Sequence, residues 1–341
     1  MQTITVEGQS GHSRIMVGER LANLGRYLPA GRTILITDEK VASHYRDQFP
    51  PADVITIGCG EKIKTLDTLA QIYDQLVALE ADRSTFIVGI GGGIVGDITG
   101  FAASTYMRGL AFGFVATSLL AQVDATVGGK NGVNFKGYKN MVGVFNQPAF
   151  VIADITLLKT LPPAEIACGL AEIVKHGCIA DAAYFDYIES HTEAVAELDE
   201  AVMLKLVSDS VKIKAAVVNQ DEREAGERRK LNFGHTLGHA FEKTVGISHG
   251  AAVSAGMVLA AELSQHKGLL AAENVDRLKK LLARLNLPVA LDFDRQAVCS
   301  ALKKDKKRQR DTIHFVLLEA LGRAVVQTLA IQELEEWLLE G

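Results

Sequence analysis

The first half of the chain alternates short β-branched runs with amphipathic helical patterns, and this alternation constrains the fold more than any other feature. The runs at residues 33–37, 54–57 and 85–90 are typical of buried strands. Between the last two runs, residues 66–81 place apolar side chains at the three- and four-residue spacing of one helical face. Because strands and helices alternate, the sequence predicts a mostly parallel α/β sheet.

The second half has a different pattern. No proline occurs between Pro163 and Pro288, and long amphipathic patterns cover residues 204–218 and 253–263. The Pro162–Pro163 pair favours an extended turn before a helix, so it marks a domain boundary. We therefore predict an α/β domain at 1–160 and a mainly helical domain at 161–341.

A small hairpin is expected near the C-terminus. The apolar runs 314–318 and 324–327 flank a turn at Gly322.

Composition limits the classes of partner. With 341 residues, 48% of them hydrophobic, the chain can bury a core of about two domains. The longest apolar stretch, 110–121, is shorter than the roughly 18 residues that a membrane span needs, and the first residues lack the pattern of a signal peptide. A net charge of -5 offers no footprint for nucleic acid. A cytoplasmic protein with a small-molecule ligand, and without membrane or nucleic-acid partners, is expected.

The four cysteines are spread along the chain without a CxxC pair. They are Cys59, Cys168, Cys178 and Cys299. This spacing argues against a disulfide framework and against a thiolate zinc site. We expect them to behave as small buried apolar residues.

A glycine-rich segment, Gly91 to Asp97, follows the third strand and precedes a helical pattern. Backbone N–H groups at the start of such a helix can bind a pyrophosphate. The match to GxGxxG is weak by itself, because glycines also permit tight turns and close packing. No Asp or Glu lies between Asp97 and Asp124, so the acidic partner of a standard dinucleotide fingerprint is missing. Residues 127–131 do not form a P-loop, because Asn131 follows Lys130 and Asp124 stands where the motif requires its earlier glycine.

A polar stripe is predicted on one helix. Arg228, Asn232, His235 and His239 are spaced by four, three and four residues, which places them on one helical face. Such side chains suit an anionic or metal-bound ligand, although a solvated face is the alternative. A zinc-protease HExxH motif is disfavoured, because Thr236 stands where that motif has glutamate.

A carboxylate joins these histidines as a candidate metal ligand. Glu172 and Lys175 are three residues apart on a predicted helix, where they form either an exposed pair or part of a site. Glutamate with two imidazoles makes a catalytic zinc set with open positions. Spacing alone does not choose among His235, His239 and His249.

Taken together and in order, these segments resemble the 3-dehydroquinate synthase family along nearly the whole chain. The resemblance is carried by residues 37–41, 91–109, 119–134, 139–140, 231–242 and 305–307, with the Glu172/Lys175 pair. It implies an N-terminal nucleotide-binding α/β domain, a helical C-terminal domain and an active site between them. Ala116, Ser118 and Ala125 depart from the usual Pro, Thr and Ser of the family, which affects cofactor contacts only.

The resemblance also implies roles for individual residues. The NAD+-binding group is Asp38, Glu61, Lys64, Gly92, Gly93, Gly96, Asp97, Thr117, Ser118, Lys130, Lys139 and Thr160. The ligands of one Zn²⁺ or Co²⁺ are Glu172, His235 and His249, which leaves His239 for proton transfer or phosphate contact. The substrate-binding group is Asp124, Lys130, Asn140, Lys175, Lys214, Arg228, Asn232, His239 and Lys306, with Arg108 contributed across a homodimer interface. Catalytic roles fall to His239, Lys175, Lys130 and Asn140.

The implied activity is conversion of 3-deoxy-D-arabino-heptulosonate 7-phosphate to 3-dehydroquinate and phosphate, in the shikimate pathway of aromatic amino-acid biosynthesis. The implied steps are transient oxidation by NAD+ at C5, loss of the C6 proton, phosphate elimination, reduction, ring opening and aldol closure. Three alternatives remain: a sibling sugar-phosphate cyclase, a metal-dependent polyol dehydrogenase, and a nucleotide-binding scaffold without activity. The retained carboxylate- and phosphate-binding pattern disfavours the sibling cyclase; its residues are Lys214, Arg228, Asn232 and His239.

Overall fold

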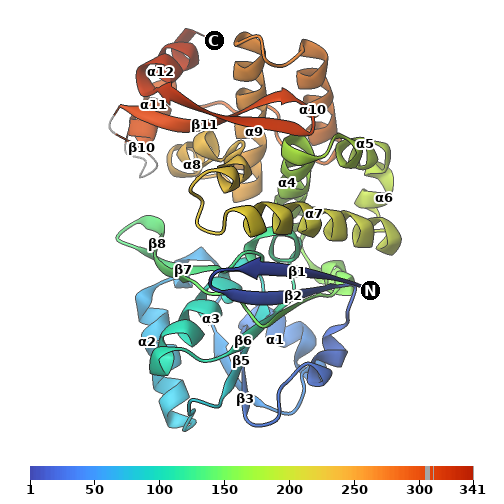
Figure 1. Cartoon of the computed structure of the whole chain (residues 1–341), viewed down its shortest axis with the longest axis vertical. Coiled ribbons are helices and arrows are strands. Elements are labelled where there is room, and N and C mark those ends of the chain that lie inside the picture. Colours follow the sequence, from blue (N-terminus) through green and yellow to red (C-terminus); the bar gives the residue numbers. More distant parts are fainter. Residues whose placement is uncertain (304–307, 310, 341) are drawn as a thin grey trace. The chain divides into compact units, whose positions relative to one another are not determined.

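The computed structural model describes residues 1–303, 308–309 and 311–340, which form two compact units (Figure 1). The first unit comprises Met1–Ile166 and Met203–Glu222, and the second comprises Ala167–Val202 and Arg223–Gly341. The first unit thus includes a helix from the middle of the chain, while the boundary at residue 160 stays a prediction. Lys306, a predicted substrate residue, lies outside the described residues.

The first unit is built on a seven-stranded sheet with the order β1-β2-β9-β6-β5-β3-β4. Its strands are β1 (Gln2–Gly8), β2 (Gly11–Val17), β3 (Thr33–Asp38), β4 (Asp53–Ile57), β5 (Phe86–Gly91), β6 (Phe112–Ala116) and β9 (Phe150–Ala153). Only the β1–β2 pair is antiparallel among these neighbours. The three predicted strands are confirmed as β3, β4 and β5, and the sheet is mostly parallel as expected.

Helices of the first unit follow the predicted alternation. They are α1 (Glu39–Tyr45), α2 (Leu66–Ala78), α3 (Gly93–Thr105) and α7 (Glu200–Gln220), with short turns η1 (Leu21–Arg26), η2 (Arg46–Gln48), η3 (Glu61–Ile63), η4 (Tyr106–Arg108), η5 (Ala121–Ala125) and η6 (Ile155–Thr160). α3 packs against β5 and β6. The core beside the sheet includes Leu35, Val88, Val115 and Ile152, one from each of four adjacent strands. Burial of these side chains fixes the parallel register.

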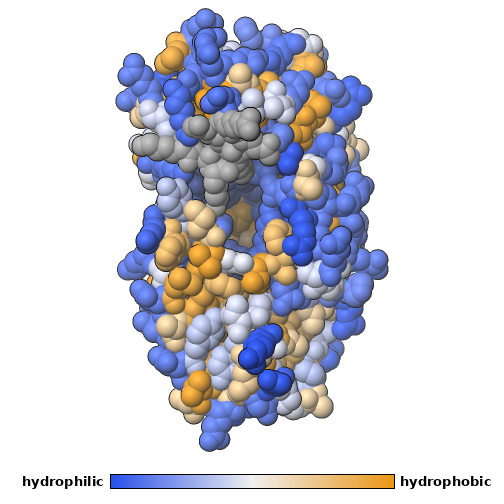
Figure 2. Space-filling view, turned by 60° about the vertical axis from the view of Figure 1, so that its left-hand side comes forward, coloured by the Kyte–Doolittle hydropathy of each residue, from blue (hydrophilic) through white to orange (hydrophobic). Residues whose placement is uncertain are grey.

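A separate hairpin, β7 (Lys130–Phe135) and β8 (Tyr138–Phe145), extends from this unit (Figure 1). Large hydrophobic side chains are exposed on it at Phe135, Tyr138 and Met141. The space-filling view shows hydrophobic residues gathered in places among a largely hydrophilic surface (Figure 2). The hairpin therefore carries part of the apolar surface of the first unit.

The second unit is mainly helical, as predicted. Its helices are most of α4 (Pro163–Ala180), then α5 (Ala182–Ser190), α6 (Thr192–Ala196), η7 (Glu227–Asn232), α8 (His235–Thr244), α9 (His249–His266), α10 (Ala272–Arg284), α11 (Arg295–Lys303) and α12 (Ile331–Glu340). A small sheet contains β10 (Arg308–Gln309), β11 (Thr312–Ala320) and β12 (Arg323–Ala330). β11 and β12 confirm the predicted hairpin, and Gly322 has the left-handed φ of 82° that its turn requires. Among the helices described, none has the length and apolar character to span a membrane.

Candidate active site

Several predicted cofactor residues lie at the carboxyl edge of the parallel sheet. Asp38 ends β3 and caps α1 by accepting a hydrogen bond from Val41 N at 2.9 Å. Gly92 lies between β5 and α3, and Thr117 and Ser118 follow β6. The chain continues from β3 to β4 on one side, whereas β5 lies on the other side of β3. Ligands of open α/β sheets bind at such a reversal of strand order.

The glycine-rich turn is close-packed against its neighbours. A Cβ atom on Gly93 would lie 2.9 Å from Ala125 Cβ, and one on Gly92 would lie 3.2 Å from Ser118 Oγ. The first N–H groups of α3 have no acceptor within their own helix, which suits an anionic ligand. The turn therefore requires glycine for packing, and phosphate binding at the start of α3 stays a prediction.

Lys64 links two predicted site residues of the first unit. Its buried Nζ atom pairs with the Asp97 carboxylate and donates to Asn140 Oδ1 at 2.6 Å. Burial raises the pKa of Asp97, while Lys64 opposes that rise. The Lys64 ammonium therefore contacts both a predicted cofactor residue, Asp97, and a predicted substrate residue, Asn140.

Asn134 is a connecting residue that the sequence analysis missed. Its backbone N–H donates to Lys64 O at 2.9 Å, and its Nδ2 donates to Glu61 Oε1 at 2.7 Å. Its Oδ1 accepts from the backbone N–H of Asn140 at 2.9 Å. Asn140 has a left-handed φ of 50°, so this acceptor holds a strained residue in place.

A second ion pair lies elsewhere in the first unit. Lys214 Nζ on α7 donates to Asp124 Oδ1 at 2.5 Å and to Asp124 O at 2.6 Å. Both residues belong to the predicted substrate group. The structure therefore brings together two groups that are 90 positions apart in the chain.

The other predicted residues of the first unit occupy turns and strand ends. Lys130 begins β7, Lys139 lies on β8, and both are exposed. Thr160 ends η6, where its hydroxyl contacts Tyr45 OH. Arg108 is exposed and has a φ of 71°, directly after Met107 with a φ of 48°.

In the second unit, Glu172 and Lys175 form a buried pair on α4. Their side chains are 0% and 1% exposed, and Lys175 Nζ contacts Glu172 Oε2. The alternative of an exposed helix pair is therefore wrong. An isolated buried charge would be very unfavourable, so each needs the other or a further ligand.

Two imidazoles face the same carboxylate. Glu172 Oε1 lies 3.4 Å from His235 Nε2 and 3.3 Å from His249 Nε2. On the opposite side of each ring, His235 Nδ1 lies 3.1 Å from Phe233 O, and His249 Nδ1 lies 3.0 Å from Glu242 Oε1. A neutral ring that donates its Nδ1 proton to these acceptors has its lone pair on Nε2, the atom that faces Glu172 and that a metal ion would bind.

The charges of this cluster depend on one another. Burial alone would raise the pKa of Glu172, but Lys175 and His235 hold it well below its usual range. Burial lowers the pKa of His235, with Glu172 opposing. Burial also acts to lower the pKa of His249, but Glu172 and Glu242 outweigh it and raise that pKa to about 9. The carboxylate is therefore ionised and available as a ligand.

This cluster has the chemistry of a catalytic metal centre. One donor atom each from Glu172, His235 and His249 lies within 4.8 Å of the other two. Both oxygens of Glu172 are buried: Oε2 contacts the Lys175 ammonium, and Oε1 faces the two imidazole Nε2 atoms. A carboxylate with two imidazoles suits Zn²⁺ or Co²⁺ and leaves coordination positions for substrate oxygens.

The polar stripe does not lie on a single helix, so that prediction is wrong. Arg228 and Asn232 belong to η7, whereas α8 begins at His235. Gly234 between them has a left-handed φ of 76°, which ends the first helix and starts the second in a new direction. The stripe is thus two segments joined by a glycine turn.

Several polar groups of this region meet despite the break. Arg228 is buried, and Asn232 Nδ2 donates to Glu224, a residue that the sequence analysis did not select. The rings of His235 and His239 meet edge to face, with centroids 5.6 Å apart. Glu242 was also missed, although the spacing of His235, His239 and Glu242 is that of one face of α8.

Comparison with models of protein families shows which family the chain belongs to. Residues 54–168 match the model described as 3-dehydroquinate synthase N-terminal, and residues 169–308 match 3-dehydroquinate synthase C-terminal. The chain belongs to the 3-dehydroquinate synthase family. A 3-dehydroquinate synthase from Nitrosospira multiformis is 43% identical, with 88% of this chain and 85% of that protein covered. The resemblance found in the sequence is confirmed.

Solved structures of related enzymes share the whole fold. A 2-deoxy-scyllo-inosose synthase, complexed with carbaglucose-6-phosphate, NAD+ and Co²⁺, is 27% identical with a TM-score of 0.86 and covers 100% of both chains. The 2-epi-5-epi-valiolone synthase from Streptomyces hygroscopicus, with NAD+ and Zn²⁺ bound, is 27% identical with a TM-score of 0.89, covering 100% of this chain and 98% of that one. The predicted fold class is confirmed.

Proposed function

We propose that this member of the family converts 3-deoxy-D-arabino-heptulosonate 7-phosphate to 3-dehydroquinate and phosphate, using NAD+ and one divalent metal ion. The observation that carries the proposal is the convergence of Glu172, His235 and His249 in a chain 43% identical to a 3-dehydroquinate synthase. The chains solved with bound NAD+ and metal support the same cofactors. The cytoplasmic location expected from the sequence stays a prediction.

We assign the metal to Glu172, His235 and His249, and the cofactor to the carboxyl edge of the sheet. When bound, NAD+ supplies reversible oxidation at C5 of the substrate and the metal supplies a Lewis acid for the C5 oxygen. The proposed cofactor-binding residues are Asp38, Glu61, Lys64, Gly92, Gly93, Gly96, Asp97, Thr117, Ser118, Lys130, Lys139 and Thr160. The N–H groups at the start of α3 bind the pyrophosphate.

The other charged residues bind and orient the substrate. The proposed group is Asp124, Lys130, Asn140, Lys175, Lys214, Arg228, Asn232, His239 and Lys306, with Arg108. A substrate that carries a carboxylate and a phosphate requires several cations, which guanidinium and ammonium groups supply. His239 contacts the phosphate or helps to move the C6 proton, while Lys175 keeps Glu172 ionised.

Asn134 gives a test of the cofactor assignment. Asn134→Ala removes one hydrogen bond to Asn140 and one to Glu61, both near the protein surface. Each such bond is worth about 0.5–1.5 kcal/mol to the local conformation, and because Asn134 orients site residues, only part of the loss should reach the cofactor: we expect NAD+ binding to weaken roughly 3- to 10-fold. Calorimetric titration with NAD+ measures this change, with Asn274→Ala on α10 as the control. Unchanged affinity would show that Asn134 does not support the cofactor site.

Product identification tests the function as a whole. Purified protein is incubated with the heptulosonate phosphate, a catalytic amount of NAD+ and Zn²⁺, and the products are identified by NMR. We expect equal amounts of 3-dehydroquinate and phosphate, no accumulation of NADH, and loss of turnover after chelation of the metal. A protein that is folded and loaded with NAD+ and metal, yet forms no product, would contradict the proposed substrate.

The second candidate is a sibling sugar-phosphate cyclase. It is favoured by the match to two such enzymes over nearly the whole chain, although their 27% identity is well below the 43% of the 3-dehydroquinate synthase. Turnover of a hexose or heptulose phosphate in place of the heptulosonate would identify it. Net NADH formation from an alcohol would instead indicate a polyol dehydrogenase, and binding without turnover would indicate a scaffold.

We also propose a homodimer in which Arg108 acts across the interface. The support is the resemblance of the chain together with the exposed Met107–Arg108 turn, in which both residues have positive φ. Arg108→Ala and Glu172→Gln are each expected to be inactive. If Arg108 acts in trans, subunits of the two variants mixed at random should recover about a quarter of wild-type activity, because half of the dimers then contain one intact site.

The mixing experiment needs subunit exchange to be complete. Two affinity tags, one on each variant, report the fraction of mixed dimers, and each parent alone sets the background. If mixed dimers form and activity equals the sum of the two parents, Arg108 does not act across the interface.

A further inference from the structure

We propose that Glu242 is a positioning residue of the metal centre: its carboxylate fixes the tautomer and ring orientation of His249. The inference rests on the proposed assignment of Glu172, His235 and His249 as ligands. The proposal is supported by the 3.0 Å contact between Glu242 Oε1 and His249 Nδ1, on the side of the ring opposite Glu172. None of the assigned roles includes Glu242.

The contact sets which ring nitrogen is available to a metal. An ionised carboxylate only accepts hydrogen bonds, so it requires the proton of His249 on Nδ1. In the neutral ring that a metal ion binds, the lone pair is then on Nε2, and this atom lies 3.3 Å from Glu172 Oε1. Metal-binding histidines commonly have such a carboxylate partner, which orients the ring and increases its basicity.

The two histidine ligands are held in different ways. His235 Nδ1 faces the backbone oxygen of Phe233, two residues earlier, so the turn before α8 orients that ring. The side chain of His249 is 30% exposed at the start of α9, and the carboxylate that orients it comes from another helix. Glu242 therefore joins the first residue of α9 to the last turns of α8.

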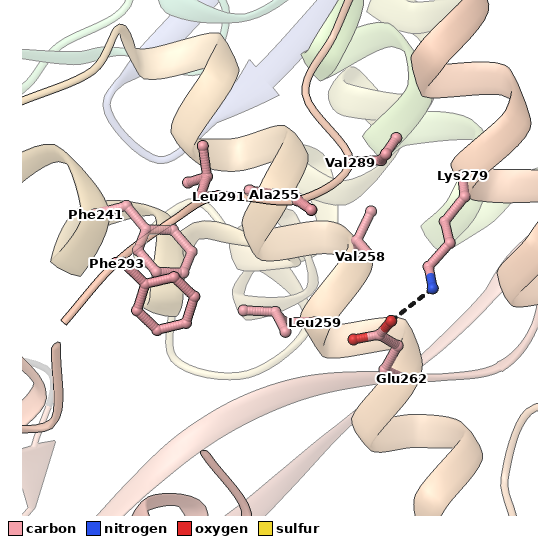
Figure 3. A pocket seen from close by; sticks show the side chains of 10 residues that line it. Phe241, Ala255, Val258, Leu259, Glu262, Lys279, Val289, Leu291 and Phe293 are labelled. Carbon is pink, nitrogen blue, oxygen red and sulfur yellow. Dashed lines mark ion pairs between the residues drawn. The ribbon is translucent and has the colours of Figure 1, made fainter. Parts of the chain in front are cut away.

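Glu242 belongs to a turn of α8 that is held by buried neighbours. Its side chain is 6% exposed, and the preceding residue, Phe241, is buried with its ring 4.9 Å from that of Phe293. Figure 3 shows these two rings together at one end of a pocket. The pocket has a volume of about 230 Å³ and a mainly apolar lining. Burial of Phe241 anchors the turn of α8 that carries Glu242, so the carboxylate starts from a fixed part of the helix.

The test measures Zn²⁺ affinity of the metal-free full-length protein, by competition with a chelator and without substrate. Glu242→Ala is expected to lower the affinity about 10- to 100-fold, as loss of an orienting partner does at other metal sites. Glu242→Gln keeps an acceptor oxygen and should lose less. Glu273→Gln, the same chemical change on an exposed residue of α10, is the control and should bind Zn²⁺ like the wild type. Thermal unfolding of each metal-free variant reports damage to the fold.

A double variant separates positioning from a general effect of charge. His249→Ala alone should weaken Zn²⁺ binding strongly, and adding Glu242→Ala to it should cause little further loss if Glu242 acts through His249. The Co²⁺-loaded Glu242→Gln protein should also show a changed visible spectrum, since the ligand field depends on ring orientation. Equal losses from Glu242→Ala in both backgrounds, or wild-type affinity in the single variant, would overturn the proposal. Wild-type affinity in His249→Ala would instead reject the ligand assignment itself.

Discussion

Glu172→Gln is expected to lose the bound metal and, with it, to lower kcat/KM by at least about 1,000-fold. This decrease is equivalent to roughly 4 kcal/mol of transition-state stabilisation. Glutamine has almost the same size as glutamate but lacks the charge that two imidazoles and Lys175 surround. A neutral amide is a poor ligand for Zn²⁺ or Co²⁺ beside two histidines. Metal content by elemental analysis and steady-state kinetics with added metal measure the two losses.

Loss of stability must be separated from loss of the ligand. In Glu172→Gln the buried Lys175 loses its carboxylate partner, and breaking a buried ion pair costs about 3–5 kcal/mol. The double variant Glu172→Gln/Lys175→Met removes both charges and should recover much of the unfolding free energy without recovering metal. His235→Ala leaves the ion pair in place and should lose metal with less damage to the fold. Full metal occupancy and full turnover in Glu172→Gln would refute the ligand assignment.

The regular elements were predictable because their signals are local. β-branched runs and the spacing of apolar residues depend on the immediate neighbours of each residue, and they located β3, β4, β5 and the β11–β12 hairpin. Burial of the Glu172–Lys175 pair was not predictable in this way. Two charges three residues apart on a helix look the same whether the helix is exposed or enclosed by other elements.

The errors and omissions at the site have identifiable causes. A single helix through the polar stripe requires a helical φ at Gly234, whereas a left-handed φ is open to glycine at little cost and changes the chain direction there. Asn134 contacts Asn140 only because of the register of the β7–β8 hairpin, which spacing does not specify. Glu242 was within reach of the sequence, because it continues the spacing of His235 and His239, but its partner His249 lies on the next helix.

Because α8 and α9 approach each other closely at Gly256, substitution of this glycine is expected to lower stability strongly. Gly256 lies on α9, and a Cβ atom there would overlap the carbonyl oxygen of Gly234 and lie 3.0 Å from Gly238 N. These are backbone atoms, so a change of side-chain rotamer does not relieve the overlap. Gly256→Ala should therefore force the two helices apart and lower the free energy of unfolding by about 2–3 kcal/mol, even though alanine favours helices more than glycine.

The same substitution should weaken the metal centre without touching a ligand. Gly234 directly precedes His235, and α9 begins at His249, so separating the helices moves two of the three proposed ligands apart. Denaturant unfolding and Zn²⁺ titration of the metal-free protein measure the two effects, with Gly25→Ala as the control because its new Cβ would meet no heavy atom closer than 4.0 Å. Wild-type stability with wild-type Zn²⁺ affinity in Gly256→Ala would mean that the helices relax at no cost. A loss of stability with unchanged affinity would mean that the ligands keep their geometry independently of the contact at Gly256, and the metal centre would then depend on α4 and the helix starts alone.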